Sequence, residues 1–218
     1  MHLEYCCYNK NPIEDVRTEI TNVFDAIGLG FSGVALPLYI LRQISHELSD
    51  IPLTISCPID YPLGCGDRKV RQHESLVAVK SGATAIDLVM SPYLLSKGVL
   101  ETIKKDVSPI LGMCEAYKAT LRVILNYDLC ETKEEAFEGV KMLREIGAEI
   151  IIPSSGFRND DIFDNILFCR LIEKELGATA ICSGRMWLEK HYKSVINSGI
   201  SGLRVYSLKN SNCLGVSN

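Results

Sequence analysis

The sequence lacks several features that would assign it to a specialised class of protein. No apolar run approaches the roughly 20 residues that a helix needs to cross a bilayer, so no membrane segment is expected. The N-terminus lacks a basic stretch followed by an apolar block, and no secretory signal is predicted. The net charge of the 218 residues is −4 and the charges are scattered, which argues against a nucleic-acid-binding surface.

Metal-binding patterns are also missing, although cysteine is plentiful. There are nine cysteines, and no two form a Cys-x-x-Cys pair. Most lie inside apolar runs, which predicts small buried side chains in a reducing compartment rather than disulfides or metal ligands. The four histidines are dispersed, so the ligand set of a zinc site is absent. We therefore expect a cytoplasmic protein with no metal and no cofactor.

What the chain does have is a repeated alternation of apolar β-runs and amphipathic helical patterns. The β-runs are predicted to start near residues 2, 31, 52, 83, 120, 148, 178 and 202. Such a repeat, about 29 residues long, calls for parallel strands, and eight units have the size of a TIM barrel. We expect an α/β protein with one domain, residues 1–218, folded as a (β/α)8 TIM barrel. The tail after the last strand is too short for a full helix, so the last helix is expected to be short or missing.

A doubly wound open sheet has the same repeat and is the structural alternative. No Gly-x-Gly-x-x-Gly or Walker motif follows a predicted strand to favour it.

Polar residues gather where the predicted strands end, which is where TIM barrels place their functional groups. Asp87 lies within an apolar strand, where a carboxylate is costly to bury unless it is paired. Arg122 on the next strand is the candidate partner. Two roles stay open for this pair: a structural ion pair, or a group that binds substrate or transfers protons.

Serine and glycine follow the predicted sixth and seventh strands. Ser154-Ser155-Gly156 ends one strand and Ser183-Gly184 ends the next. Turn formation alone explains these residues, and a phosphate site near the last strands of the barrel is the other interpretation.

Several segments, in chain order, resemble the motifs of one known family. They are Tyr61-Pro62-Leu63-Gly64 and the stretches 81–89, 122–126, 151–157 and 180–185. From about Ile55 to Tyr206 the chain resembles deoxyribose-phosphate aldolase, a family of class I aldolases with a TIM-barrel fold. The resemblance implies lyase chemistry on a small phosphorylated sugar. It carries the retained catalytic positions to Asp87 and Arg122, and substrate or phosphate binding to Ser154, Ser155, Gly156, Ser183, Gly184, Arg185 and Arg204.

The departures from the family pattern fall on the chemistry. By resemblance, the Schiff-base lysine corresponds to Ile152, and a second lysine that lowers its pKa corresponds to Ile181. Glu4 corresponds to the aspartate of the first strand. Arg185 and Arg204 stand where the family has glycines, and each could bind an anion or block the phosphate site.

Three functions therefore stay open. The expected one is an aldolase-like barrel without Schiff-base activity that acts as a binding, regulatory or structural subunit. The second is an enzyme that uses carboxylates, with a divalent metal as one option; the candidates are Glu4, Asp60, Asp87 and Asp128. The third is a working aldolase with a displaced lysine; the candidates are Lys10, Lys133 and Lys209.

The expected partners follow from these three candidate functions. They are a small phosphorylated sugar or another anion, and a homo-oligomeric or other protein partner, with no nucleic acid and no membrane. Strand alternation in the family register points Ile150, Ile152 and Ser154 inward, together with Thr179, Ile181 and Ser183. The old catalytic pocket is thus predicted to be filled and partly apolar.

Overall fold

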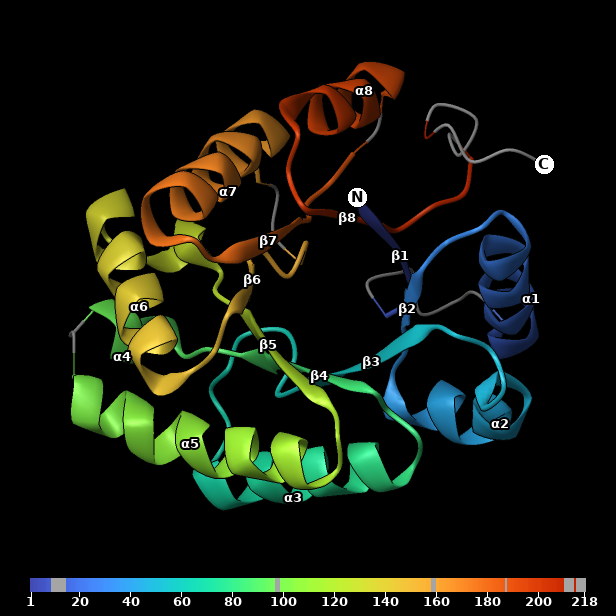
Figure 1. The fold of residues 1–218 in the computed structure, drawn as a ribbon, viewed down its shortest axis with the longest axis horizontal. Helices are drawn as coiled ribbons and strands as arrows, with labels where there is room; N and C mark the ends of the chain where they lie inside the picture. The colour runs from blue at the N-terminus through green and yellow to red at the C-terminus, as the bar shows by residue number, and fades with distance from the viewer. Residues whose placement is uncertain (9–14, 97–98, 158–159, 187, 210–213, 215–218) are drawn as a thin grey trace.

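The computed structural model describes residues 1–8, 15–96, 99–157, 160–186, 188–209 and 214. Eight parallel strands close into a barrel in chain order, and the helices form an outer ring (Figure 1). The first strand pairs in parallel with both the second and the last, which closes the barrel. The prediction of a TIM barrel is confirmed, and the open-sheet alternative is wrong.

The strands begin within a few residues of their predicted starts. They are β1 His2–Cys6, β2 Gly33–Ala35, β3 Thr54–Ile59, β4 Ala85–Val89, β5 Thr120–Ile124, β6 Ile150–Ile152, β7 Thr179–Cys182 and β8 Gly202–Val205. The helices are α1 Val16–Gly28, α2 Leu38–Leu48, α3 Arg68–Lys80, α4 Pro92–Ser96, α5 Leu100–Ala116, α6 Lys133–Ile146, α7 Ile162–Leu176 and α8 Glu189–Ser198, with a 3₁₀ turn at Tyr127–Leu129.

Local sequence signals set the ends of the helices. The Asp161 side chain accepts a hydrogen bond from the backbone N–H of Phe163 and so caps the start of α7. Gly177 ends the same helix in the left-handed conformation, which glycine adopts without steric cost. Thr132 caps α6 in the same way as Asp161 caps α7, and Gly147 ends it. These caps fix where each helix returns the chain to the barrel.

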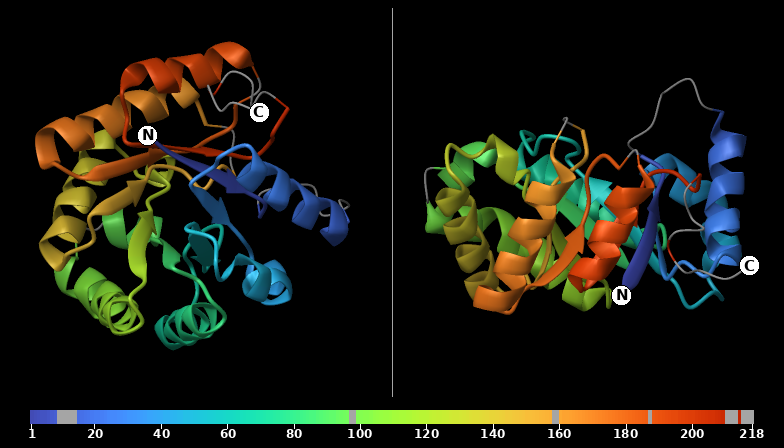
Figure 2. Two further views of the ribbon diagram at one scale, coloured as in Figure 1. Left: turned by 45° about the vertical axis from the view of Figure 1, so that its right-hand side comes forward. Right: turned by 90° about the horizontal axis from the view of Figure 1, so that it is seen from above.

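Two separate apolar regions result from strand alternation. Figure 2 shows the helices arranged around the barrel. The main core lies between the barrel and these helices, and includes the outward-facing Leu88, Val123 and Ile151. A second, smaller cluster lies inside the barrel and contains Ile152 and Ile181. Residues next to each other on one strand thus belong to different clusters, as a period of two requires.

The prediction that the last helix is short or missing concerns the region after β8, which the structure describes only in part. Residues 206–209 and 214, the described part of this region, contain no α-helix. Leu214 is buried and packs with the main core. No helix in the described ranges is long and apolar enough to span a membrane.

Candidate active site in the barrel interior

The strand register brings the inward-facing side chains into rows. Asp87 on β4 pairs with Arg122 on β5, which pairs with Ile150 on β6. Two residues further along, toward the C-terminal ends of the strands, Val89, Ile124 and Ile152 form the next row. Because the rows come from the same strands, charged and apolar side chains lie directly above one another inside the barrel.

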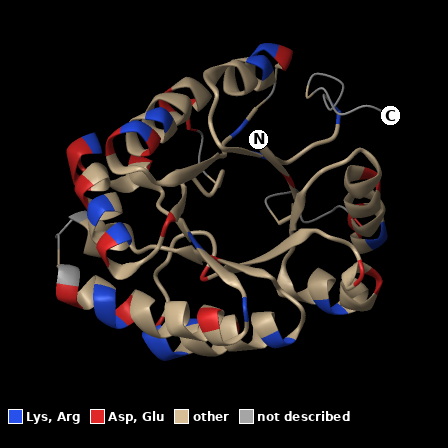
Figure 3. Cartoon of the chain, in the orientation of Figure 1, with Lys and Arg blue, Asp and Glu red and all other residues tan. Residues whose placement is uncertain are grey.

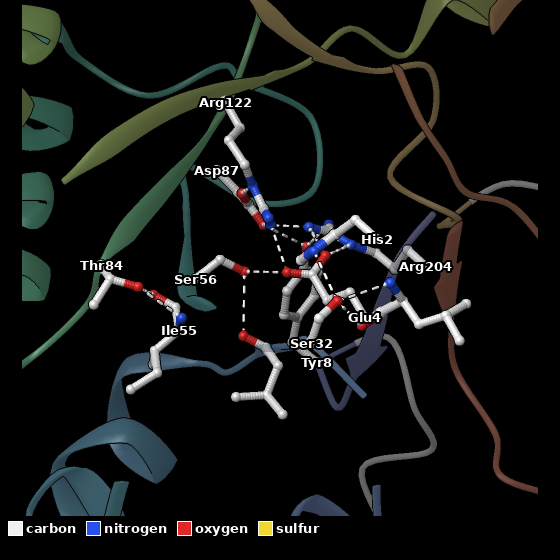
Figure 4. A network of polar contacts seen from close by, with 12 residues as sticks. His2, Glu4, Tyr8, Ser32, Ile55, Ser56, Thr84, Asp87, Arg122 and Arg204 are labelled. Carbon is white, nitrogen blue, oxygen red and sulfur yellow. Dashed lines mark hydrogen bonds and ion pairs between the residues drawn. The ribbon is translucent and has the colours of Figure 1, made fainter. Parts of the chain in front are cut away.

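Four fully buried charges form one network in the barrel interior (Figure 4). Glu4, Asp87, Arg122 and Arg204 are each no more than 2% exposed. Arg122 donates from Nε to Oδ1 of Asp87 at 2.6 Å and from Nη2 to Oε1 of Glu4 at 2.8 Å. Arg204 donates from Nε to Oε2 of Glu4 at 2.8 Å and from Nη2 to Oδ2 of Asp87 at 2.6 Å. Each carboxylate therefore meets both guanidinium groups, and the two positive charges balance the two negative ones.

Two neutral side chains extend this network. The Ser56 hydroxyl donates to Oε1 of Glu4 at 3.1 Å. The Tyr8 hydroxyl accepts from Nη1 of Arg204 and lies 3.4 Å from Oδ2 of Asp87, to which it donates. All three nitrogens of the Arg204 guanidinium thus have partners within the protein.

The network holds both carboxylates in the ionised form. Burial opposes ionisation of Asp87, but Arg122 and Arg204 outweigh it, and the pKa of Asp87 falls to about 2. The pKa of Glu4 is lowered by the same balance of burial against the two arginines. A carboxylate with such a low pKa holds no proton at neutral pH and is a weak base, which is unfavourable for acid–base catalysis.

Apolar side chains fill the interior above the charges. Val89, Ile124, Ile152 and Ile181 form a cluster in which each is at most 3% exposed, with Tyr61 and Ile150 packed against it. The predicted inward direction of Ile152 and Ile181 is confirmed by their place in this cluster. Neither position carries a group that can react with a carbonyl.

The loops after β6 and β7 are tied to each other and to their neighbours. The backbone N–H of Ser155 donates to Oδ1 of Asn126 at 2.8 Å, and that of Gly156 donates to Oγ of Ser154 at 2.9 Å. The Ser183 hydroxyl donates to the Ser154 carbonyl. The predicted phosphate residues of β6 and β7 are therefore side by side, and they use part of their hydrogen-bonding capacity on one another.

A carboxylate lies against the second of these loops. The backbone N–H of Arg185 donates to Oδ1 of Asp160 at 3.3 Å, and Asn165 donates to its Oδ2 at 2.7 Å. Gly184 has a φ of +136°, and a Cβ there would lie 2.5 Å from Nδ2 of Asn165, which explains why the position is glycine. The Arg185 side chain donates to the carbonyl oxygens of Gly156 at 3.4 Å and Phe157 at 3.3 Å. Arg185 thus lies with these loops, whereas Arg204 lies in the barrel interior.

Tyrosines at the mouth of the barrel were not singled out as site residues by the sequence. The hydroxyls of Tyr61 and Tyr206 both donate to the Ser155 carbonyl, each at 3.2 Å. Tyr61 packs edge-to-face on Tyr8 with ring centroids 4.8 Å apart. Their position after β1, β3 and β8 was the available signal, because those strand ends meet at one face of a barrel.

The other candidate residues lie away from the interior network. Asp60 is 3.3 Å from Nε of Arg71, an arginine on the outer helix α3. Asp128 is an exposed residue of the 3₁₀ turn. Within the residues described, no three His, Cys, Asp or Glu side chains are placed to hold a metal ion.

The two candidate displaced lysines that the structure describes, Lys133 and Lys209, are no closer to the interior. Lys133 starts α6, is exposed and forms an ion pair of 2.9 Å with Asp164. Lys209 is exposed in a turn after β8. Lys10 lies outside the described residues. No lysine of the described ranges lies on a strand.

The fold and the site together define a TIM-barrel protein in which β1, β4, β5 and β8 each contribute one charged side chain to the barrel interior. No family model matches the chain. Deoxyribose-phosphate aldolase of Histophilus somni is 30% identical over 152 residues, which cover 69% of this chain and 66% of that protein. The aldolase of the same name from a Thermoanaerobacter species is 26% identical over 174 residues, covering 78% of this chain and 76% of that protein.

A solved structure shows the same fold over almost the whole chain. Deoxyribose phosphate aldolase from Aeropyrum pernix, described as having a unique tetrameric structure, superposes with a TM-score of 0.81 at 22% identity. The match covers 99% of this chain and 87% of that one. The chain belongs to the deoxyribose-phosphate aldolase family.

Proposed function

We propose that this protein is a family member without Schiff-base aldolase activity, which acts as a binding, regulatory or structural subunit. One observation carries the proposal: the interior positions that correspond to the two lysines are Ile152 and Ile181, and both are buried in an apolar cluster. A Schiff base forms only on a primary amine, which isoleucine lacks. Arginine cannot replace it, because the guanidinium stays protonated.

The remaining interior charges support this proposal. Both oxygens of Asp87 accept hydrogen bonds from arginine side chains. Its low pKa and full burial favour a structural ion network over a proton-transfer group. The same argument applies to Glu4, so the retained charged positions support stability of the barrel rather than turnover.

The proposal also includes a ligand, an anion that binds at the loops after β6 and β7. The backbone N–H groups of Ser155, Gly156 and Arg185 are engaged within the protein, which reduces what the loops offer to a phosphate. Arg185 is half-buried at the edge of these loops and carries a positive charge. We propose that a small phosphorylated sugar or another anion, if it binds here, meets the protein through Arg185.

A reducing, cytoplasmic location belongs to the same proposal. Eight cysteines fall in the described residues, and no disulfide joins any two of them. Six of these thiols are buried, which suits a compartment where disulfides do not form.

Borohydride trapping tests the loss of activity. The protein is incubated with deoxyribose 5-phosphate and sodium borohydride beside the Histophilus somni relative as a positive control, and intact masses are measured. We expect an adduct on the relative alone, and no retro-aldol product from this protein. An adduct on any lysine would overturn the proposal, and arginine variants of Lys10, Lys133 and Lys209 would then show which one reacts.

A thermal-shift titration tests the binding role separately. A stabilisation by deoxyribose 5-phosphate or inorganic phosphate that disappears in Arg185→Gln would support an anion site. No shift with either compound would remove the anion from the proposal and leave the structural role.

A further inference from the structure

An acidic hollow opens between the start of α6 and the start of α7, where the chain leaves β5 and β6. Its volume is about 310 Å³. Five of the described residues that line it are acidic and one, Lys133, is basic. The acidic residues are Asp128, Glu131, Asp160, Asp161 and Asp164. Acidic residues on α6 and α7 are red in Figure 3. Like charges gathered in one hollow give it a negative potential, which attracts cations.

Two of these carboxylates also hold the fold together. Asp160 accepts hydrogen bonds from Nδ2 of Asn165 at 2.7 Å and from the backbone N–H of Arg185 at 3.3 Å. Asp161 accepts from the backbone N–H of Phe163 at 2.7 Å and so caps α7. The donors in these contacts are neutral amides. Both carboxylates therefore keep their charge and still contribute to the potential of the hollow.

A primary ammonium group already occupies the rim of the hollow. Nζ of Lys133 lies 2.9 Å from Oδ1 of Asp164, and the two side chains are 58% and 49% exposed. An ion pair this exposed contributes little to stability, so another cation can replace the lysine at low cost. Glu131 is exposed, and its carboxylate has no partner within the described residues. The rim can therefore accept further positive charge.

A nearly buried tyrosine lines the same hollow, and its hydroxyl lacks a partner. Tyr127 is 5% exposed, and its ring stacks on that of Phe168 with centroids 4.5 Å apart. Its hydroxyl forms no hydrogen bond with another described residue. The oxygen is nevertheless accessible, because the fully enclosed unpartnered side-chain atoms of the described residues belong to His2, Arg71 and Asn165. Since a buried phenol is normally hydrogen-bonded, this one points to a ligand.

The carboxylates of the hollow act on this hydroxyl. Burial raises the pKa of Tyr127, and the charges of Asp164, Asp160 and Asp128 raise it further. The phenol thus keeps its proton at neutral pH, and its oxygen can accept a hydrogen bond from a ligand. A phenol oxygen among carboxylates favours a donor that is itself positively charged, such as an ammonium group.

The spacing of the carboxylates is unsuited to a metal ion. Within the described residues, no three acidic, histidine or cysteine side chains are placed to hold one. The carboxylates are divided between two walls instead: Asp128 and Glu131 follow β5, whereas Asp161 and Asp164 lie at the start of α7. Separated negative groups suit a ligand with two separated positive charges.

From this arrangement we infer that the hollow binds a small aliphatic diamine. One ammonium group donates to the hydroxyl of Tyr127, and the other takes the place of Lys133 at Asp164. The inference goes beyond the proposed function and does not depend on it.

Isothermal titration calorimetry with 1,4-diaminobutane at neutral pH and low salt tests the inference. We expect binding to one site that weakens as sodium chloride is added. Butylamine has a single ammonium group and should bind roughly tenfold more weakly, because it lacks one charged hydrogen bond. Equal binding of the two amines, or no binding of either, overturns the inference. Displacement of the diamine by an equal concentration of calcium would assign the hollow to a metal and overturn it as well.

Tyr127→Phe tests the hydroxyl while it keeps the stacked ring. The affinity for 1,4-diaminobutane should fall roughly fivefold, as expected for one lost hydrogen bond. The Tm without diamine should not fall, because the hydroxyl has no partner in the free protein. Tyr117→Phe is the matched control, since Tyr117 is 46% exposed at the end of α5. An unchanged affinity, or a lower Tm of the free Tyr127→Phe variant, overturns the inference.

Lys133→Met should change the affinity in the opposite direction. It removes the ammonium that competes for Asp164, so the diamine should bind roughly threefold more tightly. Lys141→Met is the control: it removes the same charge from α6, where Lys141 pairs with Glu138. If the two variants change the affinity equally, only net charge matters and the inference is overturned. An affinity that Lys133→Met leaves unchanged or weakens overturns the place given to the second ammonium.

Discussion

The barrel interior contains two groups of side chains that are equally buried but of opposite chemical character. The lower group consists of Glu4, Asp87, Arg122 and Arg204, and every charge in it is paired. The upper group consists of Val89, Ile124, Ile152 and Ile181 and has no polar atom in its side chains. Both are at most 3% exposed.

The two groups differ in how they respond to substitution. Each apolar side chain contributes roughly 1.5–3 kcal/mol by its burial, nearly independently of the others. The charged group is stable only as a whole, since removal of one member leaves another charge buried without a partner. A charge deleted from the lower group and a charge inserted into the upper group are therefore the two ways to test this comparison.

The largest effect is expected for Arg204→Met. This change leaves Glu4 and Asp87 with one guanidinium between them, and breaking a buried pair costs roughly 3–5 kcal/mol. Urea unfolding monitored by circular dichroism measures the loss. Arg17→Met on the exposed side of α1 is the control, and should stay within about 0.5 kcal/mol of the parent.

A double variant sharpens this result. Glu4→Leu combined with Arg204→Leu removes one charge of each sign and keeps the pair of Asp87 and Arg122. It should be more stable than Arg204→Met, because no charge is left unpaired. A double variant that is less stable than the single one would show that the network is not held together by charge balance.

Ile152→Lys should have the next largest effect. An ammonium in the dry upper group is desolvated without a partner, and we expect a loss of roughly 2–3 kcal/mol, or about 5–10 °C in Tm. Calorimetry measures it, with Ile152→Leu as a control that conserves volume. The variant should also show no aldolase activity on its own. If the lysine variant has the same Tm as the parent, the upper group is hydrated and the interior is not closed.

Acid unfolding distinguishes the charged group from the apolar group, because only the charged group contains side chains that titrate. The pKa of Asp87 is about 2 in the folded protein and 3.8 as an unperturbed group. Its contribution to stability is present above about pH 4 and is lost as the pH falls through about 2, and amounts to roughly 2 kcal/mol. Glu4 acts in the same direction, since its pKa is also lowered.

The measurement is the free energy of unfolding against pH between 2 and 5. Asp87→Asn should make the curve flatter than that of the parent. Asp106→Asn is the opposite control: burial raises the pKa of Asp106 despite Arg71, so the folded state gains protons there on acidification. Its removal should make the curve steeper. Equal slopes for the parent and Asp87→Asn would contradict the lowered pKa.

The apolar half of this interior could be predicted from the sequence, and the ionic half only in part. A period of two is enough to turn Ile152 and Ile181 inward once the strands are known. The pair of Asp87 and Arg122 could be predicted because β4 and β5 follow each other in the chain. Arg204 was expected at a phosphate loop, yet it reaches Glu4, 200 positions away, because barrel closure brings β8 beside β1. No local pattern encodes that contact.

The loops were the least predictable part of the site. Serine and glycine after β6 and β7 were recognised, but not the partners that their backbone groups use. Asn126 comes from the loop after β5, and Asp160 comes from the far end of the loop after β6; both meet their partners only in the folded chain. Hydrogen bonds between loops depend on side-chain reach and on three-dimensional placement, for which composition and periodicity give no signal.

The smallest effect is expected where two tyrosines share one acceptor at the mouth of the barrel. Tyr61 and Tyr206 both donate to the Ser155 carbonyl, and Ser155 is 3% exposed. Tyr206→Phe alone should cost no more than about 0.5–1 kcal/mol, because Tyr61 still satisfies the acceptor.

The double variant of these tyrosines decides whether the mouth is closed above the apolar group. With both hydroxyls gone, a buried carbonyl loses both donors, and its desolvation cost of roughly 1–3 kcal/mol appears in full. The double variant should therefore lose more stability than the sum of the two single variants, measured by urea unfolding in a double-mutant cycle. Water that enters from an open mouth would satisfy the carbonyl, and the two losses would then simply add. Additivity would accordingly show that the mouth is wet, and that the seal over Ile152 and Ile181 lies deeper in the barrel.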